Sequence, residues 1–510
     1  MSDWSAGYLA DVNYTFGYYP EMNPLRSRLA FAHAGIVAPS VATACELGFG
    51  QGVSVGIHAA ASNVEWHGTD FNPAQAGFAQ ALVRAAESGA QLRDDAFADF
   101  FRRADLPDFD FIGLHGIFSW ISEDNRAAIV DFVRRKLKVG GVLYISYNTL
   151  PGWAGFAPMR HLLATHAESL GAPGRGILDR VDGAMEFAER LLALNPAYVR
   201  AYPSLAERMK KVKGQNRNYV AHEYFNREWQ PMFFSDMAAR LDTAKLSFAC
   251  SVNFADHVDA LNLTEPQQAF LRDIPDGVLR QTVRDFMVNQ QFRRDYWVKG
   301  ERRLTVAERN ELLQAQWFCL VTHRPDVPMK IVGALGEASL APEIYTPLLD
   351  ALADYKPKAL GQLARQLQGK VGFGQLLQAA MVLAAGGHLA ATQDETATAR
   401  ARKHTDKLNA CLMDKARGGG DVSYLASPVT GGGVPVGRFQ QLFLLARSQG
   451  VKQPAEWAAA TWKLLAGQGQ KLIKEGKALE TPQENLAELN RLAKTFADKQ
   501  LPILRELQVA

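Results

Sequence analysis

The sequence predicts an α/β protein whose N-terminal third folds as a parallel, doubly wound sheet and whose remainder is mainly helical. Strand-like and helix-like segments alternate from about residue 41 to residue 148, a pattern typical of parallel strands joined by crossover helices. The glycine-rich stretch Glu46-Leu47-Gly48-Phe49-Gly50-Gln51-Gly52 directly follows the apolar residues 41–45. Because glycine has no Cβ, a ligand can approach the backbone of such a turn closely.

The elements of this sheet follow one another in a regular order. We expect strands at 41–45, 64–69, 91–93, 109–114 and 142–146, helices at 53–62, 72–88 and 126–137, and a turn at 138–141. Ligands of such sheets bind beyond the carboxyl ends of the strands. The residues expected at those ends are Gly48, Asp70, Asp95, His115 and Tyr147.

Composition indicates a soluble, cytoplasmic protein of several domains. The chain has 510 residues, 47% of them hydrophobic and 21% charged, and one core rarely extends over so long a chain. We expect no membrane insertion, because no uninterrupted apolar run reaches membrane-spanning length. The four cysteines form no C-x-x-C pair, so we expect no metal site. A net charge of +3 gives no reason to expect a nucleic-acid partner.

The spacing of the glycines favours S-adenosylmethionine (SAM) as the cofactor. It differs from the dinucleotide fingerprint G-x-G-x-x-G, and the phosphate-binding G-x-x-x-x-G-K-[ST] is absent, whereas SAM carries no phosphate. We expect Asp70 to accept hydrogen bonds from the ribose hydroxyls, and Asp95 to accept one from the adenine amine. Glu46 is expected to orient the loop and the cationic methionine end. The alternative for each residue is a turn glycine or a surface acid.

Further segments resemble one family of proteins. The order of glycine loop, acidic residues and Gly140-Gly141 resembles the class I SAM-dependent methyltransferases over roughly residues 30–150. Two segments narrow the resemblance to a bacterial family with a methyltransferase regulatory domain, which includes lysine methyltransferases acting on outer-membrane proteins. They are His115-Gly116-Ile117-Phe118-Ser119-Trp120 and Tyr147-Asn148-Thr149-Leu150-Pro151-Gly152-Trp153. Further segments fit the same family: His222-Glu223-Tyr224-Phe225-Asn226, Arg284-Asp285-Phe286 and Phe292-Arg293-Arg294-Asp295. The resemblance covers residues 14–300 well and the C-terminal part more weakly.

Methyl transfer to an amine requires a neutral nucleophile, so a proton acceptor is needed near the methyl group. His115 is the candidate base by residue type and position, and it is also counted among the cofactor-binding residues. Its alternative is a structural histidine. Tyr147 and Asn148 are candidates for orienting the acceptor. Trp120 and Trp153 are candidates for walls that attract a cationic amine, or they are ordinary packing residues.

The sequence motif after the last of these strands argues against a DNA base as the methyl acceptor. Residues 148–151 are similar to the N-P-P-Y motif of DNA amino-methyltransferases, but they follow the fifth strand instead of the fourth and lack the second proline and the aromatic residue. The aromatic segment 14–24 is expected either to cover the cofactor as a lid or to pack on the domain.

The chain is expected to divide into five parts. They are an N-terminal arm or lid (1–30), a SAM-binding domain (31–155), a helical insertion suited to homodimer formation (156–230), a regulatory middle domain (231–335), and a winged-helix-like and helical C-terminal domain (336–510). The third helix of the winged-helix-like module, expected near 373–385, has no arginine or lysine. Such cations dominate contacts to DNA, so we expect this module to bind protein or to be structural.

Three functions are compatible with these features. The first, implied by the resemblance, is a SAM-dependent methyltransferase acting on lysine ε-amines of a protein partner. The second is a glycan or small-molecule methyltransferase, because one sheet can serve many acceptors. The third is a SAM-sensing or scaffold protein that binds a partner through the winged-helix-like region.

Overall fold

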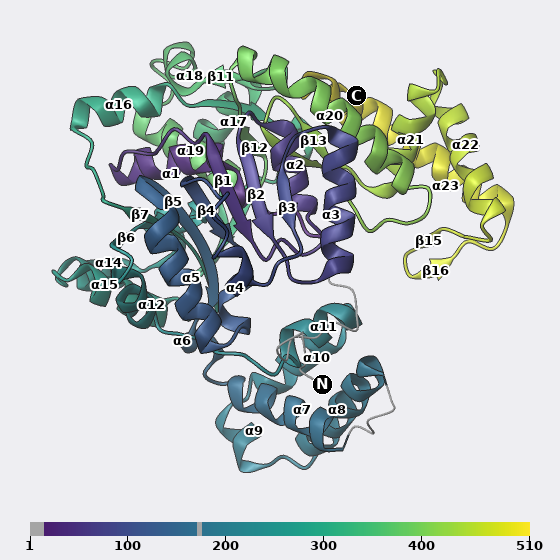
Figure 1. Ribbon diagram of the computed structural model, residues 1–510. Coiled ribbons are helices and arrows are strands. Elements are labelled where there is room, and N and C mark those ends of the chain that lie inside the picture. The colour runs from purple at the N-terminus through teal and green to yellow at the C-terminus, as the bar shows by residue number, and fades with distance from the viewer. Residues whose placement is uncertain (1–14, 171–175) are drawn as a thin grey trace.

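A computed structural model describes residues 15–170 and 176–510, so Tyr14 of the expected lid lies outside the described part. The main sheet has seven strands in the order β3-β2-β1-β4-β5-β7-β6 (Figure 1). The first five strands of that order are parallel, and β7 and β6 are antiparallel to their neighbours. The strands are β1 (Thr43–Leu47), β2 (Glu65–Thr69), β3 (Gln91–Arg93), β4 (Phe109–Leu114), β5 (Leu137–Asn148), β6 (Leu246–Ser251) and β7 (Phe292–Lys299).

The last two strands correct the expected domain boundaries. Both come from residues 231–335, which the sequence suggested as a separate middle domain, yet β7 pairs with β5 over seven residues, including Tyr144 with Tyr296. These residues therefore complete the sheet, and the expected boundary at residue 155 does not separate the two parts. The sheet is mixed and not wholly parallel, because β7 and β6 extend its β5 edge in antiparallel orientation.

Strand β5 is longer than expected. The expected turn at 138–141 is a bulge inside this strand: Leu137 pairs with Phe109 and Val142 with Phe111, so four residues face one. Gly140 has a φ of 81° there, a conformation that glycine adopts without strain. The Lys138 ammonium lies 2.9 Å from a carboxylate oxygen of Asp110 on β4, which ties the bulge to the neighbouring strand.

Helices cover both faces of the sheet. Every residue of α2 is buried, because the helix lies between the sheet and the C-terminal elements α20, β13 and β14. Asn72 begins α3 by accepting hydrogen bonds from the next turn, with Pro73 in the first position. The helices around the sheet are α1 (Pro24–Ala34), α2 (Val53–Ala61), α3 (Pro73–Ala86), α4 (Phe97–Phe100), α5 (Glu123–Lys136), α12 (Phe234–Asp242), α13 (Asp259–Asn262), α14 (Glu265–Arg272) and α15 (Gly277–Met287).

A helical region lies beside the sheet, at the lower end in Figure 1. It has a hydrophobic core of its own, which includes Trp153, Phe156, Leu163, Met185 and Phe225. Its helices are α6 (Leu150–Trp153), α7 (Ala157–Ser169), α8 (Ile177–Ala193), α9 (Ala197–Ala201), α10 (Leu205–Lys213) and α11 (Arg217–Tyr224). This region can thus present side chains to the sheet edge without sharing the core of the sheet.

The C-terminal part contains the helix expected near 373–385, beside a small antiparallel sheet of order β11-β8-β12, and the winged-helix-like character of this module stays a prediction. Among the described residues no helix combines the length and the apolar character needed to span a bilayer. The elements are α16 (Val306–Gln314), β8 (Trp317–Leu320), β9 (Lys330–Gly333), β10 (Gly336–Ser339), α17 (Pro342–Ala351), β11 (Lys358–Ala359), α18 (Leu360–Gln366), α19 (Phe373–Ala385), β12 (Leu389–Ala391), α20 (Glu395–Lys415), β13 (Tyr424–Ser427), β14 (Gly432–Pro435), α21 (Arg438–Ser448), α22 (Pro454–Gly467), β15 (Ile473–Lys474), β16 (Lys477–Ala478), α23 (Pro482–Thr495) and α24 (Leu501–Glu506).

Candidate active site

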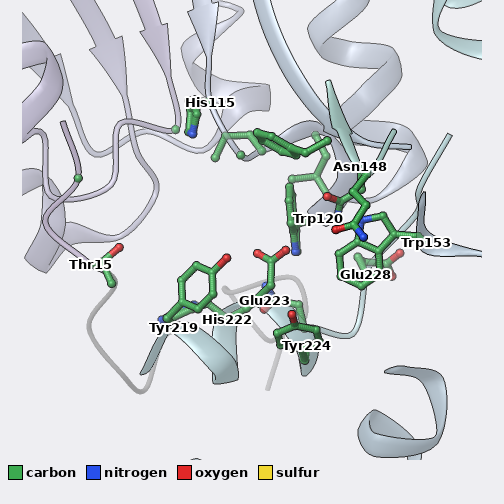
Figure 2. A pocket seen from close by; sticks show the side chains of 18 of the residues that line it. Thr15, His115, Trp120, Asn148, Trp153, Tyr219, His222, Glu223, Tyr224 and Glu228 are labelled. Carbon is green, nitrogen blue, oxygen red and sulfur yellow. The ribbon is translucent and has the colours of Figure 1, made fainter. Parts of the chain in front are cut away.

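A cavity of about 1250 Å³ lies between the carboxyl ends of the parallel strands and the helical region (Figure 2). One half, which we call the cofactor half, is lined by Gly48, Gly50, Asp70 and Asp95. The opposite half, called the acceptor half, is lined by Trp120, Asn148, Trp153, Arg208, Tyr219, Glu223 and Tyr224. His115 also lines the cavity, from the end of β4.

The surroundings of the glycine loop after β1 explain why Gly48 and Gly52 have no side chain. Gly48 has a φ of 71°, and a Cβ added there would lie 2.6 Å from Cδ1 of Ile117. Gly52 does not line the cavity: it begins α2 with a φ of 67°, and its Cβ would lie 2.2 Å from Cβ of Ala79 on α3. Gly48 and Gly50 therefore present backbone to a ligand, whereas Gly52 permits close packing of the helices.

Asp70, at the end of β2, is tied to the glycine loop. One of its carboxylate oxygens accepts a hydrogen bond from the backbone of Gly50 at 2.8 Å, and the other accepts one from Asn72 at 3.0 Å. Burial raises the pKa of Asp70 to about 6, against the opposing effect of these two bonds. Each oxygen has a second lone pair, so the carboxylate can still accept ribose hydroxyls. This geometry fits the nucleoside part of SAM.

Asp95 lies further along the same edge, after β3. Its carboxylate accepts a hydrogen bond at 3.3 Å from Arg103, and its backbone oxygen accepts one from the Thr69 hydroxyl. Both contacts fix Asp95 beside the end of β2, where it lines the cavity together with Phe71 and Phe97. An acid that lines a cavity together with aromatic side chains is suited to an adenine ring and its amine, and the role of Asp95 stays a prediction.

Glu46 does not line the cavity. Its side chain is buried beneath the loop, 2% exposed, and its Oε2 has no hydrogen-bond partner among the described residues. Burial, together with the negative charge of Asp70, raises the pKa of Glu46 to about 8. The side chain is therefore mostly protonated at neutral pH, and the expected contact with the cationic end of the cofactor has no geometric support here.

His115 lies against aromatic neighbours. Its ring stacks on Tyr19 with centroids 3.8 Å apart, and its Nδ1 is 2.6 Å from the hydroxyl oxygen of Tyr144 in a hydrogen bond. Burial lowers the pKa of His115 to about 4, although Glu21 opposes the shift. The imidazole is neutral at physiological pH, and a group with such a low pKa is a weak acceptor for an ammonium proton.

The adjacent residues Tyr147 and Asn148 point to opposite sides of β5. Tyr147 is fully buried, does not line the cavity, and its hydroxyl donates a hydrogen bond to Asp295 at 3.0 Å. The expectation that Tyr147 orients the acceptor is therefore wrong, because strand alternation directs its ring into the core. Asn148 does line the cavity, and its Nδ2 has no partner among the described residues.

The acceptor half also contains residues that the sequence reasoning did not single out. Glu223, Tyr219 and Tyr224 come from α11, and Figure 2 shows the Glu223 carboxyl group directed into the cavity between Tyr219 and Trp120. Burial raises the pKa of Glu223 to about 7, while Arg160 and Arg208 oppose the shift. The resemblance drew attention to the segment 222–226, but no local pattern indicated that it reaches the sheet edge.

Trp120 and Trp153 occupy the positions expected for aromatic walls. Trp120 lines the cavity with its Nε1 unpartnered among the described residues. Trp153 packs edge-on against Trp229, with ring centroids 5.0 Å apart, and the Arg208 guanidinium lies 4.3 Å from its ring centroid. Both tryptophans therefore line the cavity, and Trp153 also packs against its aromatic neighbour.

Comparisons with known proteins agree with this architecture. The family model "Predicted methyltransferase regulatory domain" matches residues 216–299, a range that contains Glu223, β6 and β7. Uncharacterized protein sll1526 of Synechocystis sp. is 38% identical over 513 residues, covering 99% of this chain and 100% of its own. Uncharacterized protein RP789 of Rickettsia prowazekii is 26% identical over 298 residues, covering 56% of this chain and 51% of its own.

One solved structure is similar over nearly the whole chain. PKMT2 from Rickettsia typhi, in complex with AdoHcy, superposes with a TM-score of 0.68 at 16% identity, covering 97% of this chain and 99% of that chain. The same fold therefore extends through the sheet, the helical region and the C-terminal part.

Proposed function

We propose that the chain is a SAM-dependent methyltransferase and that its acceptor is a protein lysine ε-amine. The chain belongs to one family with the Synechocystis protein, matches the predicted methyltransferase regulatory domain over residues 216–299, and has the fold of the Rickettsia typhi structure. A single observation carries the proposal: the acceptor half of the cavity combines aromatic walls with the carboxyl group of Glu223. Aromatic faces and a carboxylate both attract a cationic alkylamine. The resemblance of residues 14–300 to lysine methyltransferases supports the same acceptor.

The cofactor half offers groups of the kind that SAM binding requires. Gly48 and Gly50 offer backbone without a Cβ, Asp70 offers acceptors for the ribose, and Asp95 offers an acceptor for the adenine amine. When bound, SAM supplies an electrophilic methyl group, so that a nitrogen–carbon bond forms as the sulfur–carbon bond breaks and its electron pair stays on sulfur. Both halves line one cavity, so the two reactants would be held beside each other, and such positioning accounts for much of the rate in bimolecular reactions.

The size of the cavity supports a long acceptor side chain. Its walls extend from the ends of β1–β4 to α10 and α11, beyond what the cofactor half alone encloses. A lysine side chain is an apolar stem with a cationic tip. It can therefore contact Trp120 and Trp153 along its length while its ammonium group meets the acid.

Transfer of radiolabelled methyl groups from SAM into a bacterial lysate tests the proposal. We expect label in macromolecular material, and methyl-lysine after acid hydrolysis and amino-acid analysis. Label confined to low-mass material or glycan would contradict the lysine acceptor and support the second candidate function. Label absent from every fraction, despite SAM binding in calorimetry, would support a SAM-sensing protein.

A further inference from the structure

Glu223 lies where a proton acceptor for an amine is needed. It is placed by α11, whose neighbours Val220, Ala221 and Tyr224 are buried in the core of the helical region. Asn216 fixes the start of this helix by accepting hydrogen bonds from Asn218 and Tyr219. The carboxyl group is consequently held toward the cavity by a packed helix and not by a loose loop (Figure 2).

We propose that Glu223 takes the ammonium proton of the acceptor lysine, so that the helical region supplies the base of the reaction. This inference rests on the proposed lysine acceptor and deepens it. It also gives the helical region a chemical role: the sheet holds the cofactor, and α11 activates the nucleophile.

The surroundings of Glu223 suit this role. Trp120, Tyr219 and Tyr224 line the cavity together with the half-buried Glu223, and burial raises its pKa to about 7. Proton transfer is most effective when the pKa of the base lies near the working pH. The charged and titratable groups facing Glu223 are Arg160 of α7, Arg208 of α10, and Tyr219 and Tyr224 of α11.

The charges of Arg160 and Arg208 limit the rise in the pKa of Glu223, although neither arginine neutralises its carboxylate by direct contact. Arg208 donates a hydrogen bond to the Gly152 carbonyl at 3.2 Å, and its guanidinium lies over Trp153. Arg160 donates one to the Asn226 carbonyl and lies 5.0 Å from the ring centroid of Trp229. Both cations are therefore held by backbone carbonyls and rings, so the carboxylate stays available for an incoming ammonium group.

Three other titratable groups of the cavity, on the side of the sheet, are less suited. His115 has a pKa of about 4, and its Nδ1 is hydrogen-bonded to Tyr144. Asp70 is bonded to the loop backbone, and Asp95 is bonded to Arg103. All three belong to the cofactor side or to the strand edge, whereas Glu223 faces them from across the cavity.

The proton balance of the step is simple. The lysine enters as an ammonium ion, and one N–H proton passes to the Glu223 carboxylate, leaving a neutral amine with a free lone pair. After methyl transfer the product is a methylammonium ion. The proton on Glu223 then passes to water, which restores the carboxylate for the next turnover.

Glu223→Gln tests the inference, because glutamine keeps the shape and cannot take the proton. The measurement is the initial rate of label transfer from SAM into lysate proteins across pH 6–10, for wild type, Glu223→Gln and Glu223→Asp. Wild type is expected to gain rate through about pH 7 and then level off. Glu223→Gln should be about 100-fold slower or more at pH 8. Its rate should then climb about tenfold per pH unit toward the lysine pKa of roughly 10.4.

Controls separate chemistry from folding. Glu186→Gln changes an exposed acid on the neighbouring helix α8, outside the cavity, and should leave the profile unchanged. SAM affinity by calorimetry should stay within about twofold for Glu223→Gln, which shows that the variant is folded. Glu223→Asp should recover part of the rate and the levelling near pH 7, which a purely structural role would not restore.

Each outcome bears on one of the two proposals. A Glu223→Gln variant that methylates lysine at the wild-type rate, with the wild-type pH profile, would overturn the role of Glu223 and leave the lysine acceptor standing. A wild-type protein that labels no lysine would overturn the acceptor, and the role of Glu223 with it.

Discussion

The two halves of the cavity are built in different ways. The cofactor half comes from residues 48–95, and much of it is backbone held at strand ends, as with Gly48 and Gly50. The acceptor half consists of side chains from β5, the segment after β4 and the helical region, with Glu223 and Trp153 reaching it from different helices. The comparison indicates that the residues for the acceptor can change without changing those for the cofactor, because the cofactor half depends on the sheet alone.

The two halves also differ in whether their polar atoms already have hydrogen-bond partners. In the cofactor half, both oxygens of Asp70 already accept backbone hydrogen bonds. In the acceptor half, Nε1 of Trp120 and Nδ2 of Asn148 have no partner among the described residues. Buried polar groups normally find partners, so these two donors are suited to the proposed acceptor. The carboxylate of Asp70 is already fixed by the protein, whereas these two donors are not.

Asp70→Ala should have the largest effect and break the cofactor half alone. The change removes the carboxylate expected at the ribose, together with the hydrogen bond that fixes Gly50. Hydrogen bonds to charged groups contribute about 1.5–3 kcal/mol each, so SAM affinity in calorimetry should fall about 100-fold or more. Asp94→Ala, at an exposed neighbouring acid outside the cavity, should bind SAM as wild type does. Equal affinities for the Asp70 variant and wild type would place the nucleoside elsewhere.

The cofactor half was largely predictable from the sequence. Its residues Gly48, Gly50, Asp70 and Asp95 each follow a strand within a stretch of 50 residues, and parallel strands bring their carboxyl ends to one edge. Local spacing therefore carries the information. Glu46 and Gly52 belong to the same motif, but the structure places both away from the cavity. Distinguishing loop residues that face a ligand from those that face a helix requires the packing of α3.

The acceptor half was not predictable in the same way. Glu223 follows Asn148 by 75 residues of mainly helical chain, and helical periodicity does not say which surface meets the sheet. The pairing of β7 with β5 is likewise a contact between segments far apart in the chain. Tyr147 and Asn148 show a smaller limit of sequence-based prediction. Strand alternation places them on opposite sides of β5, but a shift of the register by one residue would exchange which of them reaches the cavity.

His115→Ala should have an intermediate effect, because His115 lies between the two halves. The variant loses the stack on Tyr19 and the hydrogen bond to Tyr144, so we expect turnover to fall about tenfold through poorer positioning. The pH profile between 6 and 9 should keep its shape, since the pKa of about 4 leaves this imidazole neutral throughout.

Steady-state rates over that pH range check the role of His115. His161→Ala, at an exposed position on α7, is the matched control and should behave as wild type. Loss of the rise in rate near pH 7 in His115→Ala would contradict the assignment of that rise to Glu223. Unchanged turnover would make His115 a structural residue only.

Glu46→Gln should have the smallest effect on binding and a measurable one on stability. Burial raises the pKa of Glu46 from its ordinary value of 4.5 to about 8. The native state thus holds a proton that the unfolded chain releases above pH 4.5. Stability from this group is fully present below about pH 4.5 and is lost as pH rises through 8. The free energy of unfolding should therefore fall over this range by on the order of a few kcal/mol.

Glutamine has no such titration, so the melting temperature of Glu46→Gln should depend less on pH between 5 and 8.5 than that of wild type. Part of the slope should persist in the variant, because burial also raises the pKa of Asp70 and of Asp295 to about 6. SAM affinity should change by less than about threefold, because the side chain does not line the cavity. A tenfold loss of affinity would instead mean that the Glu46 carboxylate acts on the cationic end of the cofactor. In that case the cofactor half would include the buried Glu46 carboxyl group beneath the loop, as well as the residues that line the cavity.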